Sequence, residues 1–313
     1  MLVPFVLATW LALTGIRRLG RRVWLEPDFW RACLMMARAR LGGRPIVALL
    51  GSEASVAVGL ADYASGSWRD PELPASACSR ERFARSLRCR RAFWEACQGL
   101  RDGARRVTPS DAHRALLDAS RRGDIRTMMT TTVDGLHGGV DDLIALFGQL
   151  EEIACVDCGA SHPWPPGYIW RRWDLHCPTC GGLLRPAVTP PDEEPDAPVF
   201  KRARRAAARC GVLLVIGCKG SHAIEERLVD VARRSGAGIV FIGQSPRAYR
   251  LHSRDRVLVG RIDRALRAFG LVLAGVRPLA RPIEPALAKG HCQAPRVAPR
   301  VAQRTPSDGA LRQ

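Results

Sequence analysis

The sequence predicts an α/β fold, in which a doubly wound parallel sheet is joined to a smaller lobe. Two observations lead to this prediction: short apolar runs of strand length alternate with amphipathic helix patterns, and two closely spaced pairs of cysteines interrupt that alternation. Strand–helix–strand order with right-handed crossovers gives a parallel sheet covered by helices on both faces. A chain of 313 residues that is 47% hydrophobic is long enough to bury such a core.

Four apolar runs are typical of buried strands, because each is of strand length and most end at Gly or a polar turn. They span residues 45–51, 124–133, 211–217 and 238–243. Their apolar character is continuous rather than alternating, which indicates strands covered on both faces. We therefore expect them to lie side by side in the parallel sheet.

The best-marked helix covers residues 108–123, and residues 81–106 are also predicted to be helical as an inserted module. Standard helix signals lie at both ends of the first of these segments. We expect the following roles there: Thr108 as N-cap, Pro109 in the first turn, Asp111 reaching back to the cap, and Gly123 as the stop.

Both ends of the chain differ from this pattern. The first fifteen residues are apolar and precede "IRRLGRR", but the run is shorter than the roughly 20 residues that span a bilayer, and no basic region precedes it. We therefore expect no membrane role for this run. It is interpreted either as a helix that packs on the domain or as the result of a start codon placed too far upstream. Beyond Gly275 the chain is rich in Pro and Arg with little apolar periodicity, which predicts a disordered basic tail.

The net charge is +18, and only three of the 48 basic residues are lysines. Clustered Arg and Lys would indicate a nucleic-acid partner, because they displace counterions from phosphates. Here the arginines are scattered along the whole chain, which favours a solvated basic surface. Nucleic-acid binding through that surface and the tail stays open as an alternative.

Four cysteines have the spacing of a metal site. Cys155 and Cys158 form one C-x2-C pair, Cys177 and Cys180 form a second, and eighteen residues separate the pairs. Four thiolates with no open position are typical of structural zinc. The alternatives are two disulfides or four unrelated thiols. This use of cysteine indicates a reducing compartment, so we expect a cytoplasmic protein.

Details around the second pair support the same interpretation. Gly181 and Gly182 follow it, where a tight turn requires freedom in φ. His162 and His176 lie close in sequence and are spare candidate ligands, but four cysteines already satisfy a zinc ion.

The order of motifs from about Pro45 to Gly243 resembles the sirtuins, the Sir2 family of NAD-dependent protein deacylases. A Gly loop follows the first strand, then come a "PSDAHRAL" helix, a "TTTVDGLH" strand, the two cysteine pairs and a "GVLLVIG" strand. The positions that match the family patterns are Gly51, Ser55, Gly59, Asp62, Pro109, Ala112, His113, Leu116, Thr130, Asp134, Gly135, Leu136 and His137. The order is more specific than any single motif.

The resemblance implies a Rossmann-like sheet with a zinc-ribbon and helical lobe, an NAD site and an acylated protein as partner. It assigns the zinc to the four cysteines, and cofactor binding to Gly51, Ser55, Asp62, Asp134 and Gly217. Together with the apolar patterns and the composition of the two ends, it gives the following boundaries. An N-terminal extension covers 1–42, a sirtuin-type domain covers 43–275, and a tail covers 276–313. Within the domain, the core lies at 43–68, 107–150 and 190–275, a helical insert at about 69–106, and the zinc ribbon at about 151–189.

The departures from the family fall where the chemistry takes place. The family's general base is a His eight positions before the first zinc cysteine, and Phe147 stands there, although Gly148 is retained. A phenyl ring exchanges no proton, and general acid–base help is typically worth about 10²–10⁴-fold in rate. No residue is therefore assigned as catalytic.

Positions that contact NAD in the family are also replaced. Thr131 and Thr132 stand for a Gln and an Asn, Glu53 for the second loop Gly, and Ala64 for an Arg. A carboxylate at 53 would repel phosphates unless it swings away. On the adenosine side the family's Gly-Thr-Ser is Gly217-Cys218-Lys219, and its Ile-Asn is Ile242-Gly243.

The substrate strand is replaced by "AVTPPDEEPDAP", whose four prolines remove amide donors for a bound peptide. We therefore expect a degenerate sirtuin-type protein that acts by binding. The alternative is an atypical NAD-dependent deacylase or ADP-ribosyltransferase in which another group, such as His137, replaces the missing base.

Overall fold

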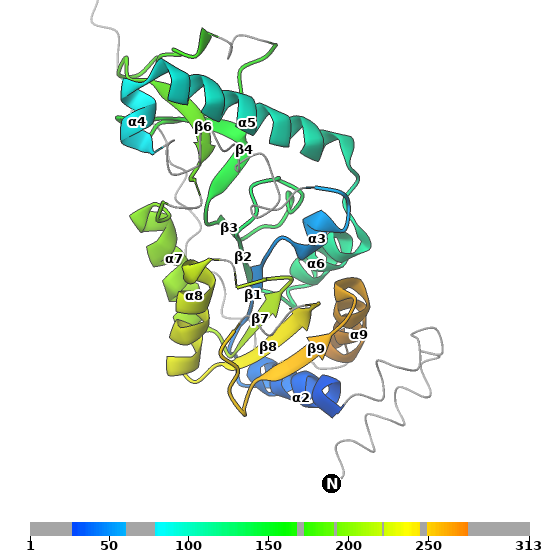
Figure 1. Cartoon of the computed structure of the whole chain (residues 1–313). Helices are drawn as coiled ribbons and strands as arrows, with labels where there is room; N and C mark the ends of the chain where they lie inside the picture. Colours follow the sequence, from blue (N-terminus) through cyan, green and yellow to red (C-terminus); the bar gives the residue numbers. More distant parts are fainter. Residues whose placement is uncertain are drawn as a thin grey trace, which may run out of the picture. The chain divides into compact units, whose positions relative to one another are not determined.

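A six-stranded sheet, parallel throughout, lies at the centre of the computed structural model (Figure 1). The structure describes residues 27–60, 79–167, 172–190, 193–220, 222–244 and 249–274. The order along the sheet is β3-β2-β1-β7-β8-β9. The strands are β1 (Ile46–Leu50), β2 (Thr127–Thr130), β3 (Leu143–Ala145), β7 (Val212–Ile216), β8 (Gly238–Gly243) and β9 (Arg256–Val259). The four predicted strands are confirmed, and β3 and β9 are added at the two edges.

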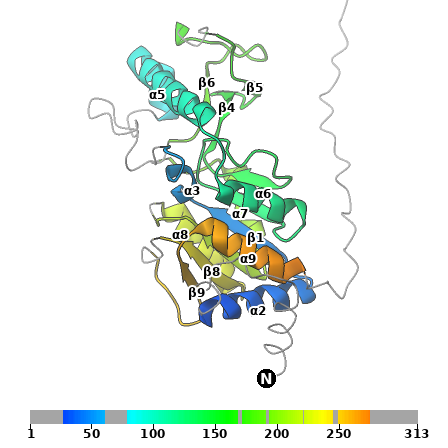
Figure 2. The same cartoon turned by 90° about the vertical axis from the view of Figure 1, so that its right-hand side faces the viewer.

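Helices cover both faces of this sheet, as the doubly wound prediction requires (Figure 2). On one face lie α2 (Pro27–Leu41), α6 (Asp111–Arg121) and α9 (Ile262–Ala274); on the other lie α7 (Ala197–Arg209) and α8 (Ala223–Arg234). Strand β1 divides its side chains between the two cores: Ile46, Ala48 and Leu50 pack with the first set, and Val47 and Leu49 with the second. This two-sided burial explains why the strand sequence is apolar without alternation.

Helix α2 shows that the described part of the N-terminal extension belongs to the core. Phe29 is fully buried, and its ring stacks on that of Phe269 in α9 with centroids 5.2 Å apart. The apolar first fifteen residues lie outside the described residues. No helix in the described part of the chain is long and apolar enough to cross a membrane. The tail predicted to be disordered, beyond Gly275, is likewise outside it.

The start of α6 differs from the prediction by two residues. Ser110, not Thr108, is the N-cap: its hydroxyl accepts from the backbone N–H of His113, and His113 Nδ1 accepts from the Ser110 N–H at 3.1 Å. This is a capping box with His in place of Glu or Gln. Asp111 pairs with Arg114 instead of reaching back, while Gly123 does follow the helix with φ of +72°.

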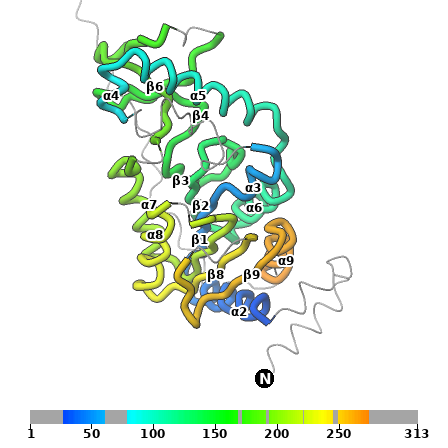
Figure 3. Tube along the Cα trace, in the orientation of Figure 1, coloured from blue at the N-terminus to red at the C-terminus, as the bar shows by residue number. Residues whose placement is uncertain are grey.

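The chain leaves the large sheet twice, and the two excursions pack together as the smaller lobe (Figure 3). The first contains α4 (Arg80–Arg85) and α5 (Leu87–Arg106), after the short α3 (Glu53–Val56). The second forms an antiparallel sheet of order β5-β4-β6, from β4 (Gly148–Cys155), β5 (Ser161–Pro163) and β6 (Leu184–Val188). Phe83, Phe93, Trp94 and Trp164 are buried in the core between them.

Candidate functional site

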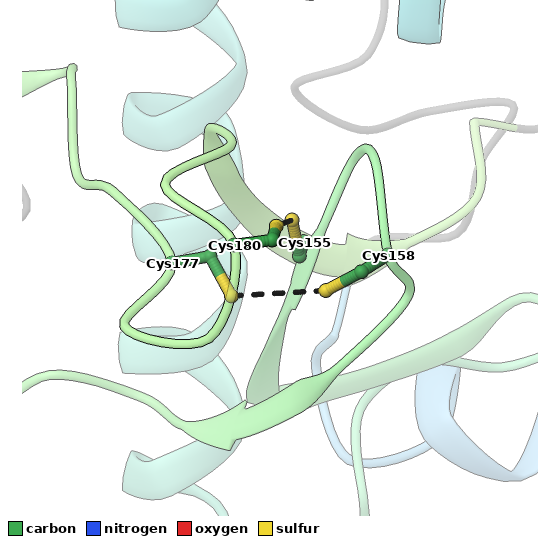
Figure 4. A group of neighbouring side chains, drawn as sticks. All are labelled: Cys155, Cys158, Cys177 and Cys180. Carbon is green, nitrogen blue, oxygen red and sulfur yellow. Dashed lines mark hydrogen bonds between the residues drawn. The ribbon is translucent and has the colours of Figure 1, made fainter.

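The four predicted cysteines come together in the smaller lobe (Figure 4). Their sulfurs all lie within 4.8 Å of one another; Cys155 Sγ is 3.4 Å from Cys180 Sγ, and Cys158 Sγ is 3.8 Å from Cys177 Sγ. A disulfide requires about 2.05 Å. Thiolates held tetrahedrally at a Zn–S distance of about 2.3 Å lie about 3.8 Å apart. The donor set and its spacing therefore fit zinc and exclude the disulfide alternative.

The turns around the cluster explain the two glycines. Gly181 has φ of +79°, whereas Gly182 is needed for space, because a Cβ there would lie 2.1 Å from Asp157 Oδ2 and 3.0 Å from Cys155 Sγ. The backbone N–H of Asp157 points at Cys155 Sγ at 3.4 Å, and the backbone of Cys158 is the largest cause lowering the pKa of the Cys155 thiol. Both effects favour the thiolate that a metal requires.

The two nearby histidines differ. His162 Nε2 lies 3.7 Å from Cys177 Sγ, beside the cluster. His176 donates from Nδ1 to the carbonyl of Gly181 at 2.8 Å, so it supports the turn. The cluster is complete without either histidine.

A second candidate region lies at the carboxyl ends of β1 and β7, where the strand order reverses and open α/β sheets bind ligands. Gly51 and Gly217 meet there. Gly51 donates its N–H to the carbonyl of Ile216 at 2.9 Å, and the N–H of Glu53 donates to the carbonyl of Gly217 at 3.1 Å. A Cβ on Gly51 would lie 2.5 Å from the Gly217 carbonyl oxygen, so the two loops touch through their backbones. We call this region the crevice.

Glu53 spans the crevice. Both of its carboxylate oxygens accept from the backbone N–H of Gln244, at 3.2 and 3.0 Å, just beyond the end of β8. The absence of a side chain at Gly243 makes this possible, because a Cβ there would lie 2.7 Å from Glu53 Oε2. A cavity of about 400 Å³ opens beside Glu53, with Ser110 and Arg261 also in its lining. The carboxylate is thus fixed in the crevice rather than turned away.

Asp134, the next predicted residue, is joined to Ser55 by a 2.6 Å hydrogen bond from the Ser55 hydroxyl. It also accepts from the N–H of Leu136 at 2.9 Å. The rings of His113 and His137 lie 4.8 Å apart beside it, and both Nε2 atoms are buried without a partner among the described residues. Burial lowers the pKa of His137 to about 4, although Asp134 opposes that shift.

Asp62, the remaining predicted cofactor residue, lies outside the described residues, as does Ala64. Thr131 and Thr132 are described, and both use their hydroxyls internally. Thr132 Oγ1 lies 2.9 Å from Thr130 Oγ1, and Thr131 donates to Glu225 Oε1 at 3.2 Å.

Glu225 is a buried carboxylate that sequence reasoning missed. It is 1% exposed, and its Oε2 accepts from the Tyr249 hydroxyl at 2.6 Å and from the Gly220 N–H at 3.1 Å. Burial raises its pKa. Nothing local distinguishes it in sequence, because a Glu in the first turn of a helix is normally a solvated residue that favours the helix dipole.

Phe147 is a core residue. Its side chain is 3% exposed and packs in the apolar cluster between the sheet and helices α7 and α8. Its carbonyl accepts from the N–H of Thr189, and its ring lies 4.9 Å from that of His222.

Comparison with known proteins relates this arrangement to one family. The model of the Sir2 family matches residues 51–223. NAD-dependent protein deacetylase 1 of Geobacillus kaustophilus is 32% identical over 214 residues, which are 65% of this chain and 83% of the relative. NAD-dependent protein deacetylase 2 of Streptomyces coelicolor is 32% identical over 221 residues, 66% of this chain and 89% of the relative.

Solved structures agree in fold. A Sir2 homologue in complex with NAD superposes with a TM-score of 0.62 at 23% identity, covering 78% of this chain and 94% of the other. A Sir2 complex with a p53 peptide and NAD has a TM-score of 0.59 at 18% identity, covering 78% and 97%. At these identities the likeness concerns the fold alone.

Proposed function

This chain belongs to the Sir2 family, as its motifs predicted, and we propose that it acts by binding a protein partner and does not catalyse NAD-dependent deacylation. The observation that carries the proposal is the burial of Phe147 in the apolar core. At the position of the family's general base stands a ring that is 3% exposed and packed among apolar side chains. A phenyl ring neither accepts nor releases a proton, so the acid–base step has no group at this position.

The electrostatics of the crevice support the same proposal. A bound dinucleotide would bring its pyrophosphate to the carboxyl ends of the strands. Here the Glu53 carboxylate is held at the carboxyl ends of the strands by the Gln244 N–H, and its negative charge would repel a phosphate placed beside it. NAD would have to displace this interaction before its phosphates reach the amides.

The zinc cluster has a structural role in this proposal. Cys155, Cys158, Cys177 and Cys180 would hold the ion with no open coordination position, so the metal would stabilise the lobe without activating water. The ion would tie the β4–β5 turn to the segment before β6. None of the nine cysteines in the described part of the chain forms a disulfide, and we infer a cytoplasmic location.

The partner need not be an acyl-lysine peptide. Strand β6 ends at Val188, and Pro190 follows one residue after Thr189, whose own N–H is already bonded to the Phe147 carbonyl. Few amides remain free to pair with an added peptide strand. We therefore infer a partner that binds another surface of the domain.

His222 supports a second candidate, an atypical NAD-dependent enzyme of the same family. Its ring lies 4.9 Å from the ring of Phe147, at the start of α8. An imidazole there lies beside the position of the missing base, whereas His137 is buried with a pKa lowered to about 4. In this candidate His222 would take the proton that the family His takes.

The experiment is a calorimetric titration of the zinc-loaded chain with NAD, followed by an assay for nicotinamide release with an acetylated peptide. We expect no heat and no release. The Phe147→His variant tests the site, with Phe147→Leu as the matched control for core packing. Activity in Phe147→His alone would show that the rest of the site is intact. Nicotinamide release by the unaltered chain, lost on His222→Ala, would refute the binding proposal and establish the enzyme.

A further inference from the structure

A second cavity, distinct from the crevice, lies at the other end of the strands of the large sheet, where they begin. Its volume is about 490 Å³. It is lined by α2 and by residues at the amino ends of the strands: Arg44 lies two residues before β1, Gly211 immediately before β7, and Arg256 opens β9. The crevice is formed at the carboxyl ends of the same strands. A strand of five residues is about 17 Å long, so the cavity and the crevice are about that far apart.

Two glycines form the floor of this cavity. A Cβ on Gly238, the first residue of β8, would lie 2.1 Å from Met35 Sδ, and one on Gly211 would lie 2.7 Å from both Ala39 Cβ and Arg44 Cβ. Because both positions lack a side chain, α2 and Arg44 lie directly against the starts of the strands. The walls of the cavity are therefore fixed by the packing of α2 and Arg44 against the starts of the strands.

Its charge is strongly positive. Four arginines line it, namely Arg31, Arg38, Arg44 and Arg256, and no Asp or Glu is among the described lining residues. Arg31 is compensated by Asp28, at 3.3 Å. No described carboxylate pairs with any of the other three.

Two of these guanidinium groups are held in place by main-chain carbonyls, which orient them without neutralising them. Arg44 donates to the carbonyls of Cys210 at 2.6 Å and Ser235 at 3.3 Å. Arg256 donates from Nη1 to the carbonyl of Asp255 at 2.7 Å, and its Nε is buried with no partner among the described residues. Asp255 does not compensate it, because its carboxylate accepts from Arg233.

The rest of the lining is apolar. Leu34 is 39% exposed, although it is a large hydrophobic side chain, and Met35 packs beside it over the start of β8. The cavity thus combines several uncompensated guanidinium groups with a small apolar wall. A guanidinium fork matches the oxygens of a phosphate, and cavities of roughly 300–1,000 Å³ suit small molecules.

We propose that this cavity binds a small organic phosphate of about mononucleotide size, with the phosphate on Arg38 and Arg256 and the organic part against Leu34 and Met35. This proposal does not depend on what the crevice does, because the two sites share no lining residue.

The test is calorimetric titration of the zinc-loaded full chain with AMP at low salt, with adenosine and pyrophosphate as comparison probes. We expect AMP and pyrophosphate to bind and adenosine to give no heat. Arg38→Gln and Arg256→Gln should each weaken AMP binding about tenfold or more, since each removes a charge-assisted hydrogen bond. Arg204→Gln, at an exposed arginine of α7, is the matched control and should leave the affinity unchanged.

Hydrogen exchange locates the ligand independently of any variant. AMP should protect amides of α2 and of the start of β8, and not those around Gly51. The proposal is refuted if AMP and pyrophosphate fail to bind, if both arginine variants bind AMP as the unaltered chain does, or if protection appears only at the crevice. Binding of oligonucleotides without binding of AMP would also refute it, and would assign the arginines to a nucleic-acid surface.

Discussion

Replacing Gly51 by Ala should destabilise the large sheet at its centre. The added methyl would lie 2.5 Å from the Gly217 carbonyl oxygen, 2.5 Å from Cys218 Cα and 2.8 Å from Cys218 N. Carbon contacts are ordinarily about 3.5–4.0 Å, so the backbones must separate by about 1 Å. None of the three atoms belongs to a side chain that can rotate away. The separation must be taken up between β1 and β7, which Gly51 and Ile216 join by a 2.9 Å hydrogen bond.

Overpacking of a well-packed site costs about 1–3 kcal/mol or more, and contacts with main-chain atoms put this variant at the upper end, at about 3 kcal/mol. For a domain of this size each kcal/mol lowers the unfolding temperature by about 2–4 °C, so we expect a decrease of about 6–12 °C. Thermal unfolding of the zinc-loaded chain, followed by far-ultraviolet circular dichroism, measures it.

The matched control is Gly99→Ala in α5. Apart from the backbone of the helix itself, no atom lies within 4 Å of the position that the added methyl would take there, and φ is not positive. Ala is favoured over Gly inside a helix by about 0.8–1 kcal/mol, so this variant should unfold slightly above the unaltered chain. If Gly51→Ala instead unfolds within about 1 °C of the unaltered chain, the backbone approach at the crevice is not as tight as described, and the reasoning fails.

Two further predictions concern the cysteine cluster and the buried histidines. Cys180→Ser should reduce bound zinc from one ion per chain to none by native mass spectrometry and lower the unfolding temperature; full zinc retention would contradict a four-thiolate site. Burial, helped by the repulsion of His113 and opposed by the attraction of Asp134, lowers the pKa of His137 from 6.5 to about 4. Between those two pH values the unfolded chain binds a proton at His137 and the folded chain does not. The free energy of unfolding should therefore fall by up to about 3 kcal/mol from pH 6.5 to 4. Urea unfolding at several pH values, for the unaltered chain and for His137→Gln, checks this. An equal change of the unfolding free energy with pH in the two proteins would contradict it.

The large sheet was predictable because its central strands are buried on both faces. A run such as residues 211–217 is apolar throughout, as expected for a short strand that is covered on both faces. The edge strands escaped prediction for the opposite reason. Strand β3 has three residues, and β9 has four, of which Leu258 alone is buried. An edge strand is covered on fewer sides, so its sequence carries a weaker signal.

The zinc cluster and the crevice were predictable to different degrees. Ligands within a C-x2-C turn are fixed by local geometry, so spacing alone identifies the four cysteines. The contact between Tyr249 and Glu225 joins residues 24 apart in sequence, and the Glu53 carboxylate meets an amide 191 residues away. The arginine-lined cavity gathers residues from 31 to 256, and in a chain this rich in arginine no spacing distinguishes them.

The family motifs that this chain retains do not by themselves require a bound cofactor. Gly51 is needed because the backbone of Cys218 leaves no room for a side chain, and the Ser55 hydroxyl is already donated to Asp134. Asp134 in turn accepts from the N–H of Leu136 and faces the buried histidine pair. Each residue thus completes a contact within the chain, and loss of one would leave a clash or an unsatisfied polar group. A fold can therefore keep the outline of a nucleotide site for its own stability after the groups that touch the ligand have been replaced. For this reason the proposal on function depends on Phe147 and Glu53, whose side chains depart from the family, and not on the motifs that identify it.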